Sequence, residues 1–518
     1  MRPPLPDPGK SEPSAPLGGG VDRTLAAKPL QLDTFRENVI LLSRDCLALR
    51  PERLRGVRKV EVRGRGGVML AVPMLCDDPA LVGPSEAGIP QPLARRLALR
   101  PGDRVEVSPA APLGTLEAVR AKVAGETLSR EVYEAIARDL AEHRWSDIEI
   151  SAFLVACASF MTAEETLDLT LAMAAAGGRL TWDRDLVVDK HCIGGVPGNR
   201  TSLIVAPIVA AHGLLIPKTS SRAITSPAGT ADTMEVLARV DLSEDEMRAV
   251  VERCGGCVVW GGRVNLSPAD DVLISVERPL SIDTPEQMVA SILSKKLAAG
   301  STHLVLDIPV GPTAKVRDRR SALKLKKAFE FVSRGIGLDL QVLITDAPQP
   351  VGRGIGPALE ARDVLAVLRG QADAPADLRD KALMLAGAIL EADPALPGGA
   401  GLARATELLR SGAALAKLEA IIEAQGPSPA SGALGELTHE VRAVRSGAID
   451  TIDCLRIAAI ARLSGAPTDP GAGVDLCVKR GDTVRRGDPL YRIHASEPSD
   501  FGFAVEAAGV DDGFRFAP

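Results

Sequence analysis

Hydroxyl groups, glycines and positive charge are concentrated in the stretch 189–232 more than anywhere else in the 518 residues. The start of this stretch predicts a buried strand at residues 186–188, a loop over 194–199 and a helix from Thr201 onward. Glycines let a backbone approach an anion closely, and the free N–H groups at a helix start attract negative charge. With Lys190 beside this loop, the pattern predicts a phosphate pocket.

A second cluster of hydroxyls and cations covers residues 218–222 and 225–230, after the apolar residues 214–216. Serine, threonine and glycine often build only turns and helix caps, and a single loop of this kind would indicate no more. Two such loops, however, could enclose one oxyanion. Neither has the GxxxxGKS/T spacing that binds a nucleoside triphosphate, so the expected ligand is free phosphate or a phosphate monoester.

Three segments of the sequence resemble one enzyme family. They are DKHCIGGVPGN at 189–199, KTSSRAITSPAGTADTME at 218–235 and VASILSKK at 289–296. The sequence is similar there to the thymidine and pyrimidine-nucleoside phosphorylases, most of all to a longer branch that includes the archaeal AMP phosphorylases. The likeness runs from about residue 128 to about residue 494. The resemblance implies a pentosyltransferase that uses phosphate to break an N-glycosidic bond.

Two reactions fit this resemblance. The first is thymidine phosphorylase-like and converts thymidine and phosphate to thymine and 2-deoxyribose 1-phosphate. The second is that of an AMP phosphorylase and converts AMP and phosphate to adenine and ribose 1,5-bisphosphate. A hypothesis of another class is a non-catalytic sensor of phosphate or a nucleotide that kept the fold, because a fold does not fix a function.

The fold class implied by the resemblance is multidomain α/β, with an all-helical domain facing an α/β domain across a cleft, as in nucleoside phosphorylases and phosphoribosyltransferases. Short β-rich segments between residues 38 and 118 predict an extra small N-terminal β domain. The expected parts are a disordered tail over 1–34, a small β domain for assembly over 35–122, a helical domain from 123–187 and 265–300, an α/β phosphate-binding domain from 188–264 and 301–436, and a C-terminal α+β domain over 437–518.

Local patterns predict several elements. Thr162 and Glu165 fit a capping box at the start of a helix over 164–175. Further expectations are strands at 304–308 and 340–345, a turn near the substrate at 352–356, helices within 376–425, and a hairpin at 481–490. That hairpin is similar to those of lipoyl-type modules but has no lysine at its tip, which favours a role in structure or assembly.

The resemblance assigns residues to each part of the substrate. Phosphate would be held by Lys190, Cys192, Gly195, Ser202, Ser220 and Thr230. The rest of the substrate would be held by Ser221, Arg222, Ala223, Ile224, Thr225 and Ser226, and by Ser291, Lys295 and Lys315. Ser291 and Lys295 are four residues apart and therefore share one helix face, and the family uses this pair to hold the base.

Asp283 and His191 are the candidate catalytic residues. Asp283 precedes a helix that Thr284 can cap and Pro285 can begin. It matches the proposed proton donor of the AMP phosphorylases, and the alternative is a solvated surface carboxylate. His191 could contact the base or the sugar, or it could be structural.

The sequence departs from the family pattern in places that bear on the substrate. Cys192 stands where the family commonly has serine, which is a better hydrogen-bond donor. Beside Lys190, its thiolate is an alternative nucleophile. Leu273 and Val276 stand where a tyrosine and an arginine help the pyrimidine enzymes to read the base. Lys315 matches a substrate-contacting lysine of the AMP enzymes and would suit a 5′-phosphate.

Composition indicates a globular chain of several domains, since 46% of the residues are hydrophobic and 25% are charged. The net charge of −6 offers no general attraction for nucleic acid or acidic membranes. The first 33 residues are rich in proline and glycine and hold no apolar signal segment, and no apolar stretch is long enough to span a bilayer. The expected location is therefore cytoplasmic.

The eight cysteines lack the density of a disulfide scaffold, and the CxxC at 254–257 has no second pair at zinc-site spacing. No metal is therefore expected. The reaction implies no cofactor other than inorganic phosphate as co-substrate. The expected partners are a small nucleoside or nucleotide and further copies of the chain, in a homodimer or larger homo-oligomer.

Overall fold

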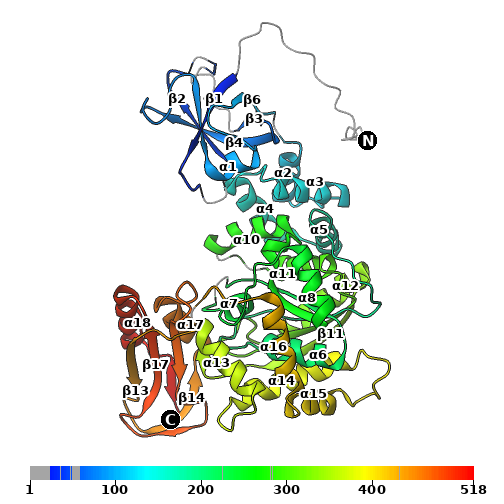
Figure 1. Cartoon of the computed structure of the whole chain (residues 1–518), viewed down its shortest axis with the longest axis vertical. Coiled ribbons are helices and arrows are strands. Elements are labelled where there is room, and N and C mark those ends of the chain that lie inside the picture. Colours follow the sequence, from blue (N-terminus) through cyan, green and yellow to red (C-terminus); the bar gives the residue numbers. More distant parts are fainter. Residues whose placement is uncertain are drawn as a thin grey trace. The chain divides into compact units, whose positions relative to one another are not determined.

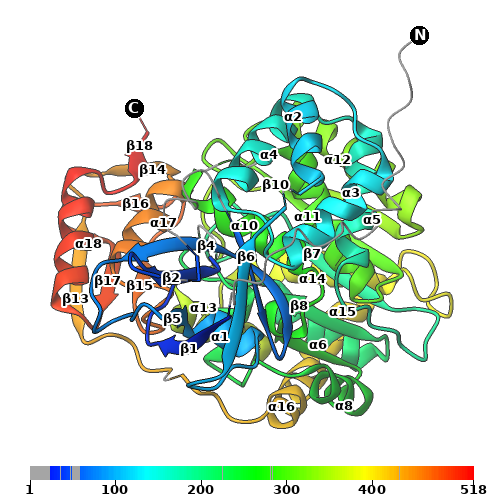
Figure 2. The ribbon, with the colours of Figure 1, turned by 90° about the horizontal axis from the view of Figure 1, so that it is seen from above.

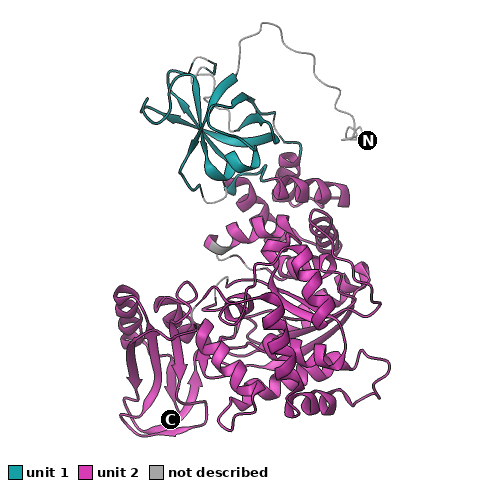
Figure 3. Cartoon of the chain, viewed as in Figure 1, with its two compact units in different colours: residues 1–114, 143–147 teal, residues 115–142, 148–518 magenta. Residues whose placement is uncertain are grey.

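The computed structural model describes residues 24–34, 37–46, 48–49, 59–111, 113–223, 226–280, 282, 284–430 and 432–517, without the side chain of Arg278. The chain folds into two compact units, residues 1–114 with 143–147 and residues 115–142 with 148–518 (Figure 3). The first unit holds a β barrel, and the second holds the helical, α/β and C-terminal parts.

The first unit is a closed barrel whose described strands follow the order β1-β5-β2-β4-β3-β6. Alternate residues of its strands, such as Val60, Val62, Val105 and Val107, are buried in one core. The elements are β1 (Thr24–Leu30), β2 (Val39–Ser43), β3 (Val60–Gly64), β4 (Gly67–Cys76), β5 (Glu86–Pro90), α1 (Gln91–Arg96) and β6 (Arg104–Pro109).

Strand β1 corrects the predicted disordered tail over residues 1–34. Leu25, Ala27 and Leu30 are buried, and the strand pairs with β5 on one side and β6 on the other. The proline content suggested a tail, but β1 contains only Pro29, close to its end, where a missing N–H removes little of the ladder. Residues 1–23 of the predicted tail lie outside the described residues.

The helical part of the second unit comes from two separate stretches of chain. Thr162 Oγ1 accepts a hydrogen bond from Glu165 N (3.2 Å), and Thr162 N donates to Glu165 Oε2 (3.0 Å), which confirms the predicted capping box. The helices are α2 (Thr115–Val123), α3 (Arg130–Ala141), α4 (Asp147–Phe160), α5 (Ala163–Ala175), α10 (Pro268–Leu280) and α11 (Pro285–Ala298). Helix α2 lies across the predicted boundary at residue 122 and belongs to the second unit.

A parallel sheet with the order β11-β10-β7 forms the centre of the α/β part, and β8 pairs with β9 beside it. The predicted strands at 304–308 and 340–345 are confirmed as parts of β10 and β11. The strands are β7 (Val188–Cys192), β8 (Ile216–Ser220), β9 (Gly256–Trp260), β10 (His303–Val310) and β11 (Asp339–Asp346).

Helices cover this sheet, and the apolar helix α6 is buried against α14, α15 and α16 in one core (Figure 1). The predicted helix from Thr201 and the predicted helices within 376–425 are therefore confirmed. The helices are α6 (Ser202–His212), α7 (Thr230–Glu235), α8 (Glu244–Cys254), α9 (Gly261–Val264), α12 (Arg319–Ile336), α13 (Pro357–Leu368), α14 (Ala376–Leu390), α15 (Gly401–Arg410) and α16 (Ala413–Gln425).

Two strands differ from their predicted extent. The strand expected at 186–188 runs from Val188 to Cys192, and residues 218–220, expected in a loop, belong to β8. Both strands carry charged side chains, so a search for apolar residues does not detect their full length. Asp189 and Lys218 can be buried because they form ion pairs within the fold. The functional side chains therefore sit on strands as well as on loops.

The C-terminal part contains two sheets, β12-β15-β17-β13 and β16-β14-β18. The predicted hairpin at 481–490 is wrong, because β16 pairs with β14 and β17 pairs with β13 and β15. Helix α18 packs against β13 and β17 (Figure 2). The elements are β12 (Gly354–Ile355), β13 (Leu437–Arg442), β14 (Gly447–Ile452), α17 (Cys454–Leu463), β15 (Gly473–Leu476), β16 (Thr483–Val484), β17 (Pro489–Ala495), α18 (Pro498–Val510) and β18 (Phe514–Phe516).

The turn at 350–354 joins the C-terminal part to the glycine loop. Lys479 Nζ donates to Pro350 O and to Asp377 Oδ2, each at 2.9 Å. Val351 N in turn donates to Pro197 O (3.1 Å) in the glycine loop. Strand β12 also pairs with β15 of the C-terminal part, although β12 precedes the predicted domain boundary at residue 436.

Among the described residues, no helix is both long and apolar enough to cross a membrane. Within the same residues, no group of three or more histidine, cysteine or acidic side chains could hold a metal ion. All eight cysteines are free, and five of them are buried, including Cys254 and Cys257 of the CxxC pattern.

Candidate active site

Lys190 is a buried cation at the centre of the predicted phosphate pocket. Only 1% of it is exposed, and its ammonium group donates to Thr201 Oγ1 (2.8 Å) and Ser202 Oγ (3.3 Å) at the start of α6. No carboxylate of the described residues forms an ion pair with it. Burial lowers the pKa of Lys190, as expected for a charge that lacks a partner. The fold thus holds a positive charge ready for an anion.

The glycine loop follows the strand that carries Lys190. Gly194 and Gly195 have φ angles of +85° and +83°, a region that favours glycine. A Cβ atom on Gly195 would lie 2.3 Å from Lys315 Cβ, so the loop packs directly on the backbone of the exposed Lys315. The loop therefore requires glycine at this position, and Lys315 is placed beside the phosphate pocket.

The second cluster supplies two hydroxyls. Ser220 Oγ, at the end of β8, is buried and has no hydrogen-bond partner among the described residues. Thr230 Oγ1, at the start of α7, accepts from Arg200 Nη1 at 3.1 Å. A buried hydroxyl without a partner is costly unless a ligand satisfies it. Ser220 is therefore suited to bind an anion.

Cys192 ends strand β7, and Asn199 Nδ2 donates to its sulfur at 3.3 Å. Burial raises the pKa of the Cys192 thiol, and the nearby carboxylate of Asp307 raises it further. A protonated thiol is a poor nucleophile. A role for Cys192 as a thiolate nucleophile is therefore disfavoured. Cys192 is instead a small residue at the start of the glycine loop.

Buried charges lie beneath the pocket. Asp189 is fully buried, and its carboxylate accepts from Lys296 Nζ (2.6 Å) and lies 3.5 Å from Lys218 Nζ. Burial lowers the pKa of Lys218 to about 7. Burial and this cluster of lysines also lower the pKa of His191 well below its usual range. The His191 imidazole is therefore neutral near pH 7 and is not an acid that carries a positive charge.

A second buried carboxylate, Asp307, lies on the strand next to β7. It pairs with Lys381 Nζ at 2.9 Å and accepts from Thr345 Oγ1 at 2.6 Å. Burial alone would raise the pKa of Asp307, but Lys381 and Lys190 outweigh it and lower this pKa. Asp307 thus carries a negative charge that Lys381 already neutralises.

The predicted base-holding pair lies on one face of α11, as its spacing requires. Asp270 of α10 joins the two side chains, because its Oδ2 accepts from Ser291 Oγ (2.9 Å) and lies 2.5 Å from Lys295 Nζ. Asp270 is 2% exposed. The helix start is as predicted, with Thr284 Oγ1 accepting from Gln287 N (3.2 Å). The pair therefore forms a neutral triad before any ligand arrives.

The segment 221–226 is held by its own acidic neighbours. Arg222 Nη2 donates to Glu235 Oε1 (2.7 Å), its Nη1 donates to Asp232 Oδ1 (3.2 Å), and its guanidinium lies 5.0 Å from the centre of the Trp260 ring. Ala223 N donates to Asp232 Oδ2 (2.7 Å). These contacts shape the segment and leave Arg222 occupied.

Two further residues of this segment, Ser221 and Ser226, differ in their surroundings. Ser226 Oγ donates to Ala228 O (2.8 Å), and Ser221 is exposed. Ile224, Thr225 and the predicted proton donor Asp283 lie outside the described residues. Leu273 and Val276, which replace the base-reading residues of the pyrimidine enzymes, are buried in α10.

The structure adds residues that sequence reasoning did not single out. Asp189 adjoins Lys190 within a motif, and Asp270 lies in a Pro-Ala-Asp-Asp run before the base-holding helix, so both had a local signal. Lys218 and Lys296 lie within the segments 218–235 and 289–296, but no role was predicted for them. The others had no local signal, because their partners come from distant parts of the chain. The added residues are Asp189, Arg200, Lys218, Asp270, Lys296, Asp307, Glu360 and Lys381.

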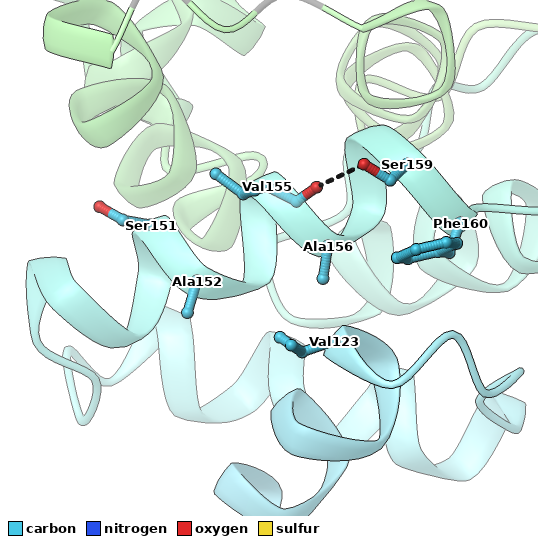
Figure 4. Close-up of a pocket in the computed structure, with 7 residues that line it drawn as sticks. All are labelled: Val123, Ser151, Ala152, Val155, Ala156, Ser159 and Phe160. Carbon is cyan, nitrogen blue, oxygen red and sulfur yellow. Dashed lines mark hydrogen bonds between the residues drawn. The ribbon is translucent and has the colours of Figure 1, made fainter.

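A groove of about 340 Å³ between α2 and α4 is unsuited to this chemistry (Figure 4). Its polar groups are two serine hydroxyls, one of which, Ser159 Oγ, donates to Val155 O (3.4 Å). The lining residues are Val123, Ser151, Ala152, Val155, Ala156, Ser159 and Phe160. A groove without a charged side chain offers nothing that would hold phosphate.

Three family models match successive parts of the chain. They are the "Glycosyl transferase family, helical bundle domain" at residues 116–177, the "Glycosyl transferase family, a/b domain" at 184–415, and the "Pyrimidine nucleoside phosphorylase C-terminal domain" at 448–509. These matches confirm the predicted multidomain α/β fold class, with its helical, α/β and C-terminal parts.

The chain is also similar to curated proteins named "Putative thymidine phosphorylase". Those of a Bradyrhizobium species (strain BTAi1) and of Rhodopseudomonas palustris (strain CGA009) are each 59% identical, over 95% of this chain and 96% and 95% of the relative. That of Methylococcus capsulatus is 52% identical, over 95% of both chains. A solved anthranilate phosphoribosyltransferase from Thermus thermophilus is 25% identical, with a TM-score of 0.49, over 60% of this chain and 99% of that one.

Proposed function

Because the chain belongs to the thymidine and pyrimidine-nucleoside phosphorylase family, we propose that it cleaves thymidine with phosphate, giving thymine and 2-deoxyribose 1-phosphate. It is a pentosyltransferase. The observation that carries the proposal is Lys190, a buried cation whose hydrogen bonds within the described residues go to hydroxyls. On the neighbouring strand β8, Ser220 Oγ is buried and has no hydrogen-bond partner among the same residues. An anion with several oxygens would satisfy both groups.

In the proposed reaction a phosphate oxygen attacks C1′ of the pentose while the C–N bond to the base breaks. The electron pair of that bond leaves with the base, which must receive a proton or a strong hydrogen bond. Lys190, Ser202, Ser220 and Thr230 would hold the phosphate at the sugar, so that the attack becomes intramolecular in effect. Cys192 and Gly195 would leave room for the anion in the loop.

The base would lie against Ser291 and Lys295. Asp270 holds both side chains in fixed positions and cancels the charge of Lys295, which suits an uncharged base. We propose Asp283 as the proton donor to the leaving base and His191 as a neutral hydrogen-bonding group near the sugar or base. Ser221, the residues 222–226 and Lys315 would border the remainder of the substrate.

The relatives' names favour a nucleoside over AMP as the substrate. A substitution at C1′ transfers no electrons and needs no activated cofactor, so we propose that phosphate is the sole co-substrate. We further propose a homodimer or larger homo-oligomer in the cytoplasm. Small nucleosides and phosphate, not nucleic acids or membranes, would be its partners.

The experiment that tests this proposal measures free base released from thymidine, uridine, AMP, CMP and UMP, each with and without phosphate. We expect phosphate-dependent release from thymidine above all. Base release that does not need phosphate would indicate hydrolysis and contradict the proposal. If no compound releases base while phosphate still binds, the sensor hypothesis takes its place.

A further inference from the structure

Arg200 lies at the end of the glycine loop, where no motif pointed to a functional cation. Its side chain is 11% exposed. Nη1 donates to Thr230 Oγ1 at 3.1 Å, and Nε forms an ion pair with Glu360 Oε2. One guanidinium thus joins a predicted phosphate residue at the start of α7 to a carboxylate on α13.

Glu360 is held as firmly as the arginine that it anchors. It is 1% exposed, and it accepts from Gly356 N and from Thr233 Oγ1, each at 3.3 Å. Burial raises the pKa of Glu360 to about 7, against the effect of Arg200, which lowers it. Removing one partner of a buried ion pair is costly. The planar guanidinium is therefore fixed, with its remaining donors in defined directions.

This contact decides what the Thr230 hydroxyl can do. A hydroxyl has one proton to donate, and it accepts through its lone pairs. Because Arg200 donates to Thr230 Oγ1, the proton of Thr230 must point in another direction. Thr230 is partly exposed, whereas Arg200 is buried, which favours contact of a ligand with the threonine over contact with the guanidinium.

Lys190 acts in the same way on the hydroxyls at the start of α6. It donates to Thr201 Oγ1 and Ser202 Oγ, and so directs the protons of these hydroxyls away from itself. The Thr201 proton goes to Asn199 Oδ1 at 3.4 Å. The hydroxyls of Ser202 and Thr230 are thus each oriented by a buried cation so that the proton is turned away from that cation. Such hydroxyls match an acceptor-rich ligand such as a phosphate ion.

We propose that Arg200 is a positioning residue for phosphate: anchored by Glu360, it holds the Thr230 hydroxyl so that its proton is donated to the bound anion. This inference rests on the proposed function, because it takes Thr230 to contact phosphate. Arg200 acts through Thr230 and does not itself touch the anion.

A double-mutant cycle tests this inference. Wild type, Arg200→Met, Thr230→Val and the double variant are titrated calorimetrically with inorganic phosphate without nucleoside, and the KM for phosphate is measured with saturating thymidine. Each single change should weaken phosphate binding by about tenfold or more, the worth of one hydrogen bond to a charged group. The double variant should bind phosphate no more weakly than the single variant that has the lower affinity. The KM for thymidine should stay unchanged in all three variants.

Independent losses that multiply in the double variant would overturn the inference, because Arg200 would then act on phosphate without Thr230. Unchanged phosphate binding in Arg200→Met would overturn it as well. Arg253→Met removes an exposed arginine paired with Glu423 and serves as a control that should bind phosphate normally. If Arg200→Met does not fold, Arg200→Lys takes its place in the same cycle. Wild-type protein that neither binds phosphate nor releases base would overturn the proposed function together with this inference.

Discussion

In the phosphate half of the site, Lys190 contacts two hydroxyls and forms no ion pair with any described carboxylate, whereas in the base half Lys295 lies 2.5 Å from Asp270. Burial lowers the pKa of Lys190. Burial acts in the same direction on Lys295, but Asp270, with smaller contributions from Asp271 and Glu277, outweighs it and raises the pKa of Lys295. Lys190 is thus a buried charge with no carboxylate partner among the described residues, whereas Lys295 is paired with Asp270.

The difference matches the two ligands that the proposed reaction brings together. Phosphate carries the charge that the first half lacks, while thymine is uncharged and needs hydrogen bonds from groups already in place. The two halves are joined through neighbouring residues, because Lys296, next to Lys295, pairs with Asp189, next to Lys190. Lys190 and Lys295 themselves have different partners, Thr201 and Ser202 for the first and Asp270 for the second, so changes in one half should nevertheless be separable from changes in the other.

The largest effect is expected from Lys190→Met, which removes the unpaired charge and keeps most of the volume. The one N–H group that Lys190 does not donate to Thr201 or Ser202 can make a charge-assisted contact to phosphate worth about 1.5 to 3 kcal/mol. Both hydroxyls also lose the donor that orients them, so kcat/KM for phosphate should fall by about two powers of ten or more. The KM for thymidine should change little. The measurement is steady-state kinetics with each substrate varied in turn. Wild-type phosphate saturation in this variant would refute the phosphate pocket.

Asp283→Asn should reduce turnover by about a hundredfold or more, because the amide cannot deliver a proton to the leaving base. Substrate binding should survive in both halves of the site. The check is kcat for thymidine and for a nucleoside whose base departs without protonation. Equal losses for the two substrates would remove Asp283 from the proton-donor role.

The pH dependence should also differ between the halves. Lys190 must be charged to hold phosphate, and its pKa is lowered from the usual value of 10.5. Affinity for phosphate should therefore be lost as the pH rises through this lowered pKa, by about tenfold for each further pH unit. The raised pKa of Lys295 predicts no such loss for thymidine. The measurement is the calorimetric Kd for phosphate and the KM for thymidine, each across the alkaline pH range. If both constants changed with pH in the same way, the difference between the phosphate half and the base half would be contradicted.

A smaller effect is expected from Asp270→Asn, which leaves a partner for Ser291 but no countercharge for Lys295. The KM for thymidine should rise about tenfold, since one charge-assisted contact that positions the base is lost. The KM for phosphate should not change. Glu286→Gln neutralises a partly exposed carboxylate in the first turn of α11, the helix of Lys295, and is the control. An equal rise in both KM values would show that Asp270 supports the whole site and not the base half.

The phosphate half was largely predictable because its chemistry is local in sequence. Lys190, the glycines and Ser202 lie within a few residues, and a glycine loop followed by an apolar helix has a recognisable pattern. The spacing of Ser291 and Lys295 similarly fixed their common helix face. These predictions needed no knowledge of the tertiary fold.

The partners that set the charges could not be predicted in this way. Ser291 and Asp270 are 21 residues apart, and the Lys296–Asp189 bond spans 107 positions. Arg200 meets Glu360 only because α6 and α13 pack together. A local signal can single out a carboxylate such as Asp189 or Asp270, but it does not identify the distant lysine that pairs with it. The contrast between a paired and an unpaired lysine therefore appears only in three dimensions.

The smallest effect is expected from Lys315→Met, which tests whether the exposed cation beside Gly195 belongs to the phosphate half. A nucleoside has no 5′-phosphate, so thymidine cleavage should change by less than about twofold, in line with surface substitutions that cost under about 0.5 kcal/mol. A nucleotide would bring about two more negative charges, and AMP cleavage would then depend on this lysine by about tenfold or more. The measurement is kcat/KM for thymidine and for AMP in both proteins. A large loss with thymidine would place Lys315 at the reacting phosphate, whereas efficient AMP cleavage that collapses in the variant would replace the nucleoside by a nucleotide as the substrate.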